Sequence, residues 1–457
     1  MMKNTAILLV FSFALVPPFF ADAEAHAADV FLEAKKSEFQ KIPIWIMGFA
    51  DGETGQQDDA GIGGQVNAIL KADLRRTQVF EVIDRSTETL PLSKAGCEAK
   101  APIAKARASA APVVTWGRIG RKDGKLLLES CAYDGGETDL IAVGKRYTGG
   151  SITMRLLRSM VHRWADELVT HYTGDPGIAQ TKIIYVSEDK AGRRDLFVMD
   201  YDGFGPRRMT ADPKLSLMPN WSPDGLAVAY TTYRRNNQEI VWLGLDKGLG
   251  KETRRILVPP ETLNITPAVS PNGRWLAYAA ARDSAGKGNS DIFIMNLKTA
   301  KKRRLTDKAS AELSPTWAPD GRELAFTSDR RGRPQIYIMR ADGSNVRRLT
   351  VEGRYNAAPA WSPRGDWIAY VCRIPGYGLK LCRISPDGKQ RFQITKGAPG
   401  EIDDSPSWAP DGRHLVFSST RGGKSHIYMI HFDGTGLERL TKGGIHHSSP
   451  AWSPGPK

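Results

Sequence analysis

The stretch Pro315-Thr316-Trp317-Ala318-Pro319-Asp320-Gly321 decides the fold, because the chain repeats it. A second copy, Pro219 to Gly225, reads Pro-Asn-Trp-Ser-Pro-Asp-Gly. A period in the forties is typical of four-stranded propeller blades. The tryptophan is placed to pack from a strand, and Pro-Asp-Gly favours a turn in which glycine can adopt positive φ. The tryptophan position of the repeat recurs at Trp221, Val269, Trp317, Trp361, Trp408 and Trp452.

The repeats also predict how many blades there are and how the ring closes. The second strands of the units begin near residues 182, 226, 274, 322, 366 and 413, which gives six units. The first unit lacks a tryptophan strand of its own, while Pro450 to Pro454 supplies one with no unit after it. A ring explains both facts, because the last strand would complete the first blade and leave no open edge. We therefore predict a six-bladed all-β propeller over residues 182–457, closed by the C-terminal strand.

The region before the repeats has a different pattern. Apolar runs predict strands near residues 42–49, 79–83, 113–119, 126–132 and 146–152, and helical spacing predicts helices near 61–73 and 154–172. Mixed strands and helices indicate an N-terminal α/β domain over residues 28–173. Gly174-Asp175-Pro176-Gly177 then ends the last helix, and we expect a linker over residues 174–181.

The first 27 residues have the features of a signal peptide. Lys3 precedes an apolar run from Ala6 to Phe20, and Ala25-x-Ala27 is a signal-peptidase pattern, with sites ending at Ala23 and Ala25 as competitors. The alternative is an uncleaved membrane anchor, but the run is short and Pro17-Pro18 interrupts it. We expect export to the periplasm without membrane insertion.

Charge favours an acidic partner. The net charge is +14, and the loops between second and third strands are rich in Lys and Arg. These loops should share one face of the ring with the loops before the tryptophan strands; the alternative is a generic solvated rim. Nucleic acid is disfavoured, because the tryptophans belong to blade cores and export removes the usual target. The basic loop residues are Lys190, Arg193, Arg194, Arg234, Arg235, Arg282, Lys287, Arg330, Arg331, Arg333, Arg373, Arg421 and Lys424.

The chain has four cysteines, and all of them follow the predicted signal peptide. Cys372 and Cys382 flank a glycine-rich turn, and Cys97 and Cys131 lie in the α/β region. An even number of cysteines in an oxidising compartment favours two disulfides, one within each region, over free thiols. The spacing matches no Cys-x-x-Cys or Cys/His metal pattern.

Nothing in the sequence favours catalysis. It contains no Gly-x-Ser-x-Gly elbow and no His-Glu-x-x-His. His446-His447 could bind a metal and Asp403-Asp404 could attract a cation near the channel, but structural roles are favoured for both pairs. We therefore predict no catalytic residues, no metal, no cofactor and no enzymatic activity. The alternative function is a periplasmic ligand sensor or hydrolase-type enzyme that uses the central channel.

The chain resembles the TolB family, the periplasmic propellers of the Tol–Pal envelope system. The resemblance covers essentially the whole precursor, from signal peptide to terminal Ala-Trp-Ser-Pro. The α/β region contributes Ile83-Asp84-Arg85-Ser86. The propeller contributes Met199 to Gly203, Ala325 to Asp329 and Gly332 to Tyr337.

The resemblance implies a monomeric protein-binding hub that supports outer-membrane integrity and cell division. A Pal-like peptidoglycan-associated lipoprotein would bind the loops before two tryptophan strands, and a TolA-like inner-membrane protein would bind the mature N-terminus. By position, the first site comprises Leu263, Asn264, Ile265, Thr266, Glu312, Leu313 and Ser314, beside the basic residues Arg282, Arg330, Arg331 and Arg333, and the second comprises Asp29, Val30, Phe31 and Leu32.

Overall fold

The computed structural model describes most of the α/β region and most of the propeller. All described residues belong to one compact unit. The predicted signal peptide and residues 28–40 lie outside them. Within the described ranges, no helix is long and apolar enough to cross a membrane. The described residues are 41–51, 61–83, 97, 113–135, 142–151, 153–211, 215–234, 237–245, 253–259, 263–281 and 289–456.

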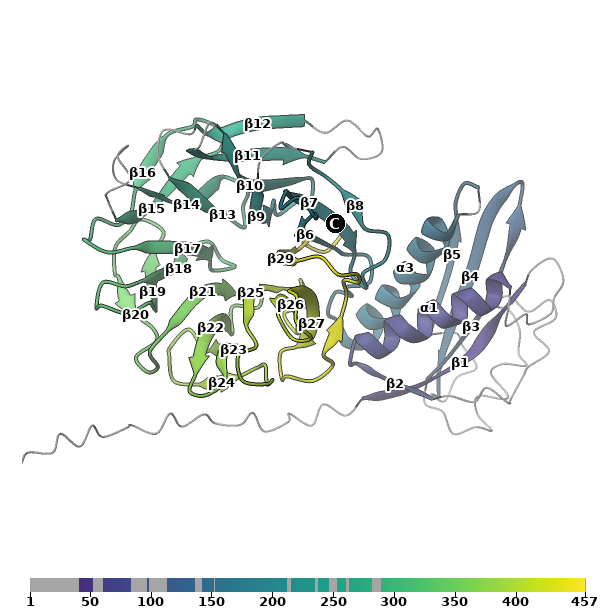
Figure 1. Cartoon of the computed structure of the whole chain (residues 1–457). Coiled ribbons are helices and arrows are strands. Elements are labelled where there is room, and N and C mark those ends of the chain that lie inside the picture. The colour runs from purple at the N-terminus through teal and green to yellow at the C-terminus, as the bar shows by residue number, and fades with distance from the viewer. Residues whose placement is uncertain are drawn as a thin grey trace, which may run out of the picture. The chain divides into compact units, whose positions relative to one another are not determined.

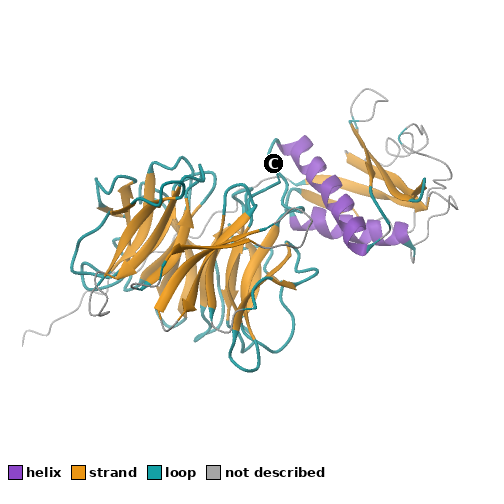
Figure 2. Ribbon diagram, turned by 90° about the horizontal axis from the view of Figure 1, so that it is seen from above, coloured by secondary structure: helices purple, strands orange, loops and turns teal. Residues whose placement is uncertain are grey.

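The α/β domain is one sheet with two helices on the same face (Figures 1 and 2). The strand order is β2-β1-β3-β4-β5. Strand β1 runs parallel to β2 and β3, while β3, β4 and β5 are antiparallel neighbours. The elements are β1 (Ile42–Asp51), α1 (Ile62–Arg76), β2 (Phe80–Ile83), β3 (Val113–Lys122), β4 (Lys125–Asp134), β5 (Val143–Thr148) and α3 (Met154–Thr173).

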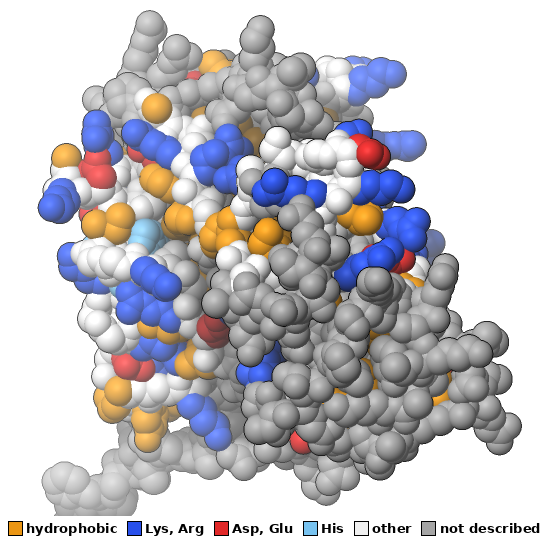
Figure 3. Space-filling model, turned by 90° about the vertical axis from the view of Figure 1, so that its right-hand side faces the viewer, with side chains coloured by type: hydrophobic (Ala, Val, Ile, Leu, Met, Phe, Trp, Pro, Cys, Tyr) orange, Lys and Arg blue, Asp and Glu red, His pale blue; other side chains and the backbone are white. Residues whose placement is uncertain are grey.

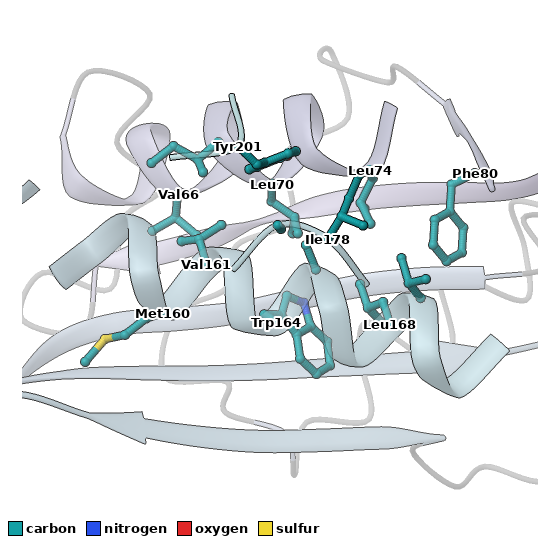
Figure 4. Close-up of a cluster of buried hydrophobic side chains, with 14 of the residues drawn as sticks. Val66, Leu70, Leu74, Phe80, Met160, Val161, Trp164, Leu168, Ile178 and Tyr201 are labelled. Carbon is teal, nitrogen blue, oxygen red and sulfur yellow. The ribbon is translucent and has the colours of Figure 1, made fainter. Parts of the chain in front are cut away.

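The two helices are held by an apolar core that they share with the sheet (Figure 4). Leu70 and Leu74 of α1 recur at four-residue spacing, so they fall on one side of the helix. They meet Trp164 and Leu168 of α3, and all four side chains are fully buried. Helix α3 begins where the Thr153 hydroxyl accepts a hydrogen bond from the backbone N–H of Leu156, at 3.1 Å. Burial of each such side chain stabilises the fold by roughly 1.5–3 kcal/mol.

The second part of the chain forms six four-stranded sheets, as the repeats predicted (Figure 1). We number the blades from the one that contains β6. Blade 1 is β29-β6-β7-β8, with β6 (Lys182–Glu188), β7 (Arg194–Asp200), β8 (Arg207–Arg208) and β29 (His447–Trp452). Blade 2 is β9 (Ser216–Trp221), β10 (Ala227–Arg234), β11 (Asn237–Gly244) and β12 (Thr253–Val258). Blade 3 is β13 (Asn264–Val269), β14 (Trp275–Ala281), β15 (Ser290–Asn296) and β16 (Lys302–Arg304).

The remaining three blades follow the same plan, with every strand antiparallel to its neighbours. Blade 4 is β17 (Glu312–Trp317), β18 (Glu323–Ser328), β19 (Gln335–Arg340) and β20 (Arg347–Arg348). Blade 5 is β21 (Asn356–Trp361), β22 (Ile368–Ile374), β23 (Gly378–Ile384) and β24 (Arg391–Gln393). Blade 6 is β25 (Asp403–Trp408), β26 (His414–Ser419), β27 (His426–His431) and β28 (Glu438–Arg439).

The ring closes in blade 1, which confirms the prediction from the unmatched terminal repeat. Strand β29 pairs antiparallel with β6, and Trp452 lies opposite Ile183. The Trp452 indole donates to the Thr181 hydroxyl at 2.7 Å, and the Ser453 hydroxyl accepts from the Lys182 backbone N–H at 2.9 Å. The C-terminal strand therefore completes the sheet that begins the propeller.

The junctions between blades alternate between two chemical types. In the first type, which we call tryptophan junctions, Trp221, Trp317 and Trp408 donate from the indole Nε1 to the backbone carbonyls of Ala451, Ala268 and Ala360 in the preceding blade, at 2.9–3.0 Å. In the second type, which we call acceptor junctions, the side chains of Asn220, Thr316 and Ser407 accept from the backbone N–H of Val269, Trp361 and Trp452 in the following blade, at 2.9–3.3 Å. The two types of junction therefore alternate around the six-bladed ring.

The segment after α3 is held on both sides. The Asp166 carboxylate of α3 accepts from the backbone N–H groups of Ala179 and Gln180, at 2.8 and 3.0 Å. Burial raises the pKa of Asp166 to about 6, although these hydrogen bonds lower it. Asp175 accepts from Arg413 of the propeller at 2.7 Å. A Cβ at Gly177 would lie 2.1 Å from Asp166 Oδ1, so this position admits only glycine.

Both disulfides expected from the sequence form. Cys97 pairs with Cys131, with their Cα atoms 5.5 Å apart. Cys372 pairs with Cys382 across the β22–β23 hairpin, with their Cα atoms 5.9 Å apart. The alternative of free thiols is therefore wrong in this structure.

Candidate partner-binding face

The segments just before the tryptophans meet at the centre of the ring. The sequence predicted loops here, but the structure places these segments in the innermost strands, such as β13 and β17. They line a pocket with a volume of about 160 Å³ together with six prolines, one from each blade. Each proline follows a non-glycine residue with positive φ, between 47° and 55°, a conformation that is costly for ordinary side chains. The six residues before the prolines are Met218, Thr266, Ser314, Ala358, Ser405 and Ser449.

This backbone conformation comes from a bulge in every innermost strand. In blade 4, for example, the pairing of β17 with β18 shifts register between Leu313 and Thr316. A bulge bends its strand and breaks regular pairing, and bulges are common beside functional sites. All six innermost strands carry this bulge at the same level. The pairing within each sheet therefore fixes the backbone shape of the channel mouth.

Two residues predicted to bind a partner instead pair with each other inside blade 4. The Glu312 carboxylate is fully buried and accepts from Arg330 Nη2 at 2.9 Å. The Ser328 hydroxyl donates to the same carboxylate, also at 2.9 Å. The Arg330 guanidinium lies over the rings of Tyr337 and Phe326, at 4.8 and 5.6 Å, and its side chain is only 16% exposed.

The same arrangement recurs in blade 6. Arg421 donates to both oxygens of the buried Asp403 carboxylate, at 2.9 and 2.8 Å, and its guanidinium lies over Tyr428. The Ser419 hydroxyl donates to Asp403 at 2.5 Å. Arg330 and Arg421 thus neutralise buried carboxylates, and this corrects the expectation that they add free positive charge to the face. Because Arg421 already neutralises the Asp403 carboxylate, Asp403 has less need of the cation that the sequence analysis considered near the channel.

The start of β13 is fastened to blade 2. Asn264 is 2% exposed and donates through its amide nitrogen to the backbone carbonyls of Gln238 and Pro259, both at 3.2 Å. Thr266 accepts from the backbone N–H of Ser314 at 3.3 Å, which joins the two predicted partner loops at the channel mouth. Leu263, Ile265 and Leu313 are half-buried around them. Asn264 and Glu312 therefore hold the starts of β13 and β17 in place, and their half-buried neighbours offer the accessible atoms.

The remaining predicted residues have different positions. Arg331 and Arg333 are exposed in the β18–β19 loop. Arg282 and the segment Asp29 to Leu32 lie outside the described residues. Lys and Arg side chains are also spread over the face seen in Figure 3, with few acidic groups among them. Positive charge is therefore present on this side of the molecule as well as in the β18–β19 loop.

Two histidines, one in blade 6 and one in blade 1, are buried at the closing junction. His426 and His447 are 3% and 5% exposed, and their ring centroids are 5.5 Å apart. Burial and the nearby charge of His426 lower the pKa of His447 to about 4. His446, by contrast, is exposed. His447 is therefore buried and neutral, whereas His446 lies at the surface. This supports a structural role for His447, as the sequence analysis favoured.

Sequence reasoning missed a rigid group of residues over blades 5 and 6. Lys380 is fully buried, and its ammonium donates to the backbone carbonyl of Glu401 at 2.6 Å. This bond fastens the loop before β25 to the β22–β23 hairpin, on which Tyr377 is 49% exposed. The only signal in the sequence was the cysteine pair that flanks the hairpin turn.

The architecture defines a class of two-domain propeller proteins, in which a small α/β domain precedes a closed six-bladed ring. The chain belongs to the TolB family, because the model of the TolB beta propeller domain matches residues 169–456, more than half of the chain.

Curated relatives agree with this assignment, and a solved structure shows the same fold. The chain is 28% identical over 316 residues to the Tol-Pal system protein TolB of Francisella tularensis subsp. tularensis, covering 66% of this chain and 71% of the relative. It is 33% identical over 214 residues to a protein TolB homolog of Chlorobium chlorochromatii, covering 47% and 45%. The crystal structure of TolB from Acinetobacter baumannii has the same fold, with a TM-score of 0.75 at 24% identity, over 91% of this chain and 97% of that chain.

Proposed function

We propose that this chain is a non-enzymatic, monomeric hub of the Tol–Pal system that acts in the periplasm after cleavage of residues 1–27. Its channel mouth would bind a Pal-like lipoprotein, and Asp29 to Leu32 would bind a TolA-like inner-membrane protein. The observation that carries the proposal is the family match over residues 169–456, joined to a mouth that the blades hold rigid. Through these contacts the chain would support outer-membrane integrity and cell division.

The accessible side chains at the mouth suit a partner that is partly apolar and partly acidic. Leu263, Ile265 and Leu313 would supply apolar contact, while Arg331 and Arg333 would supply positive charge. Asn264, Glu312 and Arg330 would act indirectly by holding the starts of β13 and β17 in place. Charge at the rim of an interface mainly raises the association rate, and salt screens it.

The test is binding of the full mature chain to the soluble domain of the Pal-like lipoprotein from the same organism, by calorimetry and by stopped flow. We expect a saturable complex, and Arg331→Glu should lower the association rate several-fold at low salt but little at high salt. Arg322→Glu is a matched control, because Arg322 is an exposed arginine of the same blade, in the Pro-Asp-Gly turn at the other end of the strands. Absence of binding by the wild-type chain would contradict the proposal, as would equal effects of the two substitutions.

A further inference from the structure

The strongest unassigned feature is a group of exposed side chains over blades 5 and 6. Tyr377 at the tip of the β22–β23 hairpin is 49% exposed, and Ile402, just before β25, is 43% exposed. Arg373 is exposed on β22, and its backbone N–H donates to the carbonyl of the half-buried Tyr355 at 3.0 Å. We call Tyr355, Arg373, Tyr377 and Ile402 the blade 5–6 patch.

The hairpin under this patch is held rigid. The disulfide between Cys372 and Cys382 links its two strands, and both cysteines are fully buried. The turn closes through a hydrogen bond from the backbone N–H of Tyr377 to the carbonyl of Ile374, at 3.1 Å. Tyr377 is therefore an exposed aromatic ring on a backbone that has little freedom to move.

The neighbouring loop is fixed to the same frame. The backbone N–H of Ile402 donates to the Thr420 hydroxyl at 2.8 Å, and the backbone N–H of Thr420 donates to the carbonyl of Ile402 at 3.0 Å. The Lys380 ammonium donates to the backbone carbonyl of Glu401. A Cβ at Gly378 would lie 3.5 Å from the same carbonyl oxygen. The hairpin tip and the loop thus pack closely, and Ile402 is presented beside the hairpin.

Exposed apolar side chains on a fixed backbone are favourable for binding, because little side-chain or loop entropy remains to be lost. Tyrosine and arginine are also the residues that most often dominate the energy of an interface. Single exposed apolar residues are ordinary, but here Tyr377 and Ile402 lie on two segments that Lys380 ties together, and Arg373 is on the strand that leads into the same turn. Arg373 adds a fork of donors that matches a carboxylate.

We propose that the blade 5–6 patch is a protein-docking surface for a partner that presents a bulky apolar side chain next to a carboxylate. Tyr377 and Ile402 would receive the apolar group, and Arg373 would bind the carboxylate. This inference rests on the proposed function. The patch lies at the same end of the blades as the channel mouth, so it would extend the contact with the Pal-like lipoprotein onto blades 5 and 6.

The test measures the affinity of full-length mature variants for the soluble domain of the Pal-like lipoprotein. We expect Tyr377→Ala to weaken binding at least tenfold, and Ile402→Ser and Arg373→Ser threefold to tenfold each. Leu226→Ser is the matched control, because Leu226 is 39% exposed but lies in a Pro-Asp-Gly turn at the other end of the strands. It should change affinity less than twofold. Thermal unfolding of each variant checks that the fold is intact.

The outcomes separate the two proposals. If the wild-type chain binds and Tyr377→Ala changes affinity less than twofold while remaining folded, the patch is not a docking surface and the proposed function stands. If the wild-type chain does not bind the lipoprotein, the proposed function is wrong and the patch loses its partner. Selective weakening by the three patch variants supports both.

Discussion

The tryptophan junctions and the acceptor junctions solve the same packing problem with different groups. A tryptophan junction uses a buried indole of one blade to satisfy a carbonyl of the preceding blade, whereas an acceptor junction uses a short polar side chain to satisfy an N–H of the following blade. The difference follows from one position, which is Asn, Thr or Ser in blades 2, 4 and 6 and Ala in blades 1, 3 and 5. The sequence repeat is thus nearly sixfold, whereas the hydrogen bonds between the blades alternate between two types and repeat only three times around the ring.

The largest expected effect is removal of the strand that closes the ring. Deletion of residues 447–457 would take away β29, leave β6 as an open edge and abolish both junctions of blade 1. We expect loss of cooperative unfolding by circular dichroism and aggregation on purification. Deletion of residues 455–457 alone is the control and should leave the unfolding transition within about 1 °C of wild type. A cooperative transition in the longer deletion would show that closure is dispensable.

The next effect compares two tryptophans at the same position of the repeat. Trp317 Nε1 has a carbonyl partner at 3.0 Å, whereas Trp361 Nε1 is buried without a partner among the described residues. Trp317→Phe should therefore lower the free energy of unfolding by about 2 kcal/mol, through lost volume and an orphaned carbonyl. Trp361→Phe loses volume only and should cost about 1 kcal/mol less. Urea unfolding of both variants gives the comparison, and equal losses would mean that the indole hydrogen bond contributes nothing.

Acid should weaken the closing junction more than the others. The folded pKa of His447 is lowered to about 4, from about 6.5 in the unfolded chain, so folding favours the neutral ring. The neutral His447 ring makes its full contribution to the free energy of unfolding above pH 6.5. This contribution is lost as the pH falls from 6.5 toward 4. We expect a loss of about 1 kcal/mol between pH 7 and pH 5, after allowance for solvent screening.

The control for this pH effect is His447→Asn, since Asn264 and Asn356 occupy the corresponding position in blades 3 and 5. This variant should have a flatter stability profile between pH 7 and pH 5, measured by urea unfolding at several pH values. An unchanged acid slope in the variant would assign the effect to another group.

The smallest effect concerns an acceptor junction. Thr316→Val keeps the shape of the side chain and removes the oxygen that accepts from the Trp361 N–H at 3.3 Å. Because that hydrogen bond is long, we expect a loss of only about 0.5–1 kcal/mol in urea unfolding. Thr327→Val, which removes the 3.0 Å acceptor for the Ala358 N–H, should cost more. The reverse order would contradict the importance of hydrogen-bond length here.

The sequence allowed much of this fold to be predicted, because its signals were local or periodic. The tryptophan repeat and the unmatched Pro450 to Pro454 predicted six blades and their closure. The even number of cysteines, with one pair in each region, predicted both disulfides. The charge pattern was less reliable. Arg330 and Glu312 are 18 residues apart, and nothing local shows that one neutralises the other. The bracing of Ile402 by Thr420 is likewise invisible until the loops are folded.

The closing strand also sets an order of events during synthesis. Lys182 and Ser453 are 271 residues apart, yet each is needed to finish the same sheet. Contacts between such distant segments form late and slow the folding of a chain. Blade 1 must therefore wait, with one edge exposed, until the last residues have emerged. During that interval the unpaired edge is open to aggregation, and it closes only when the last residues join the sheet.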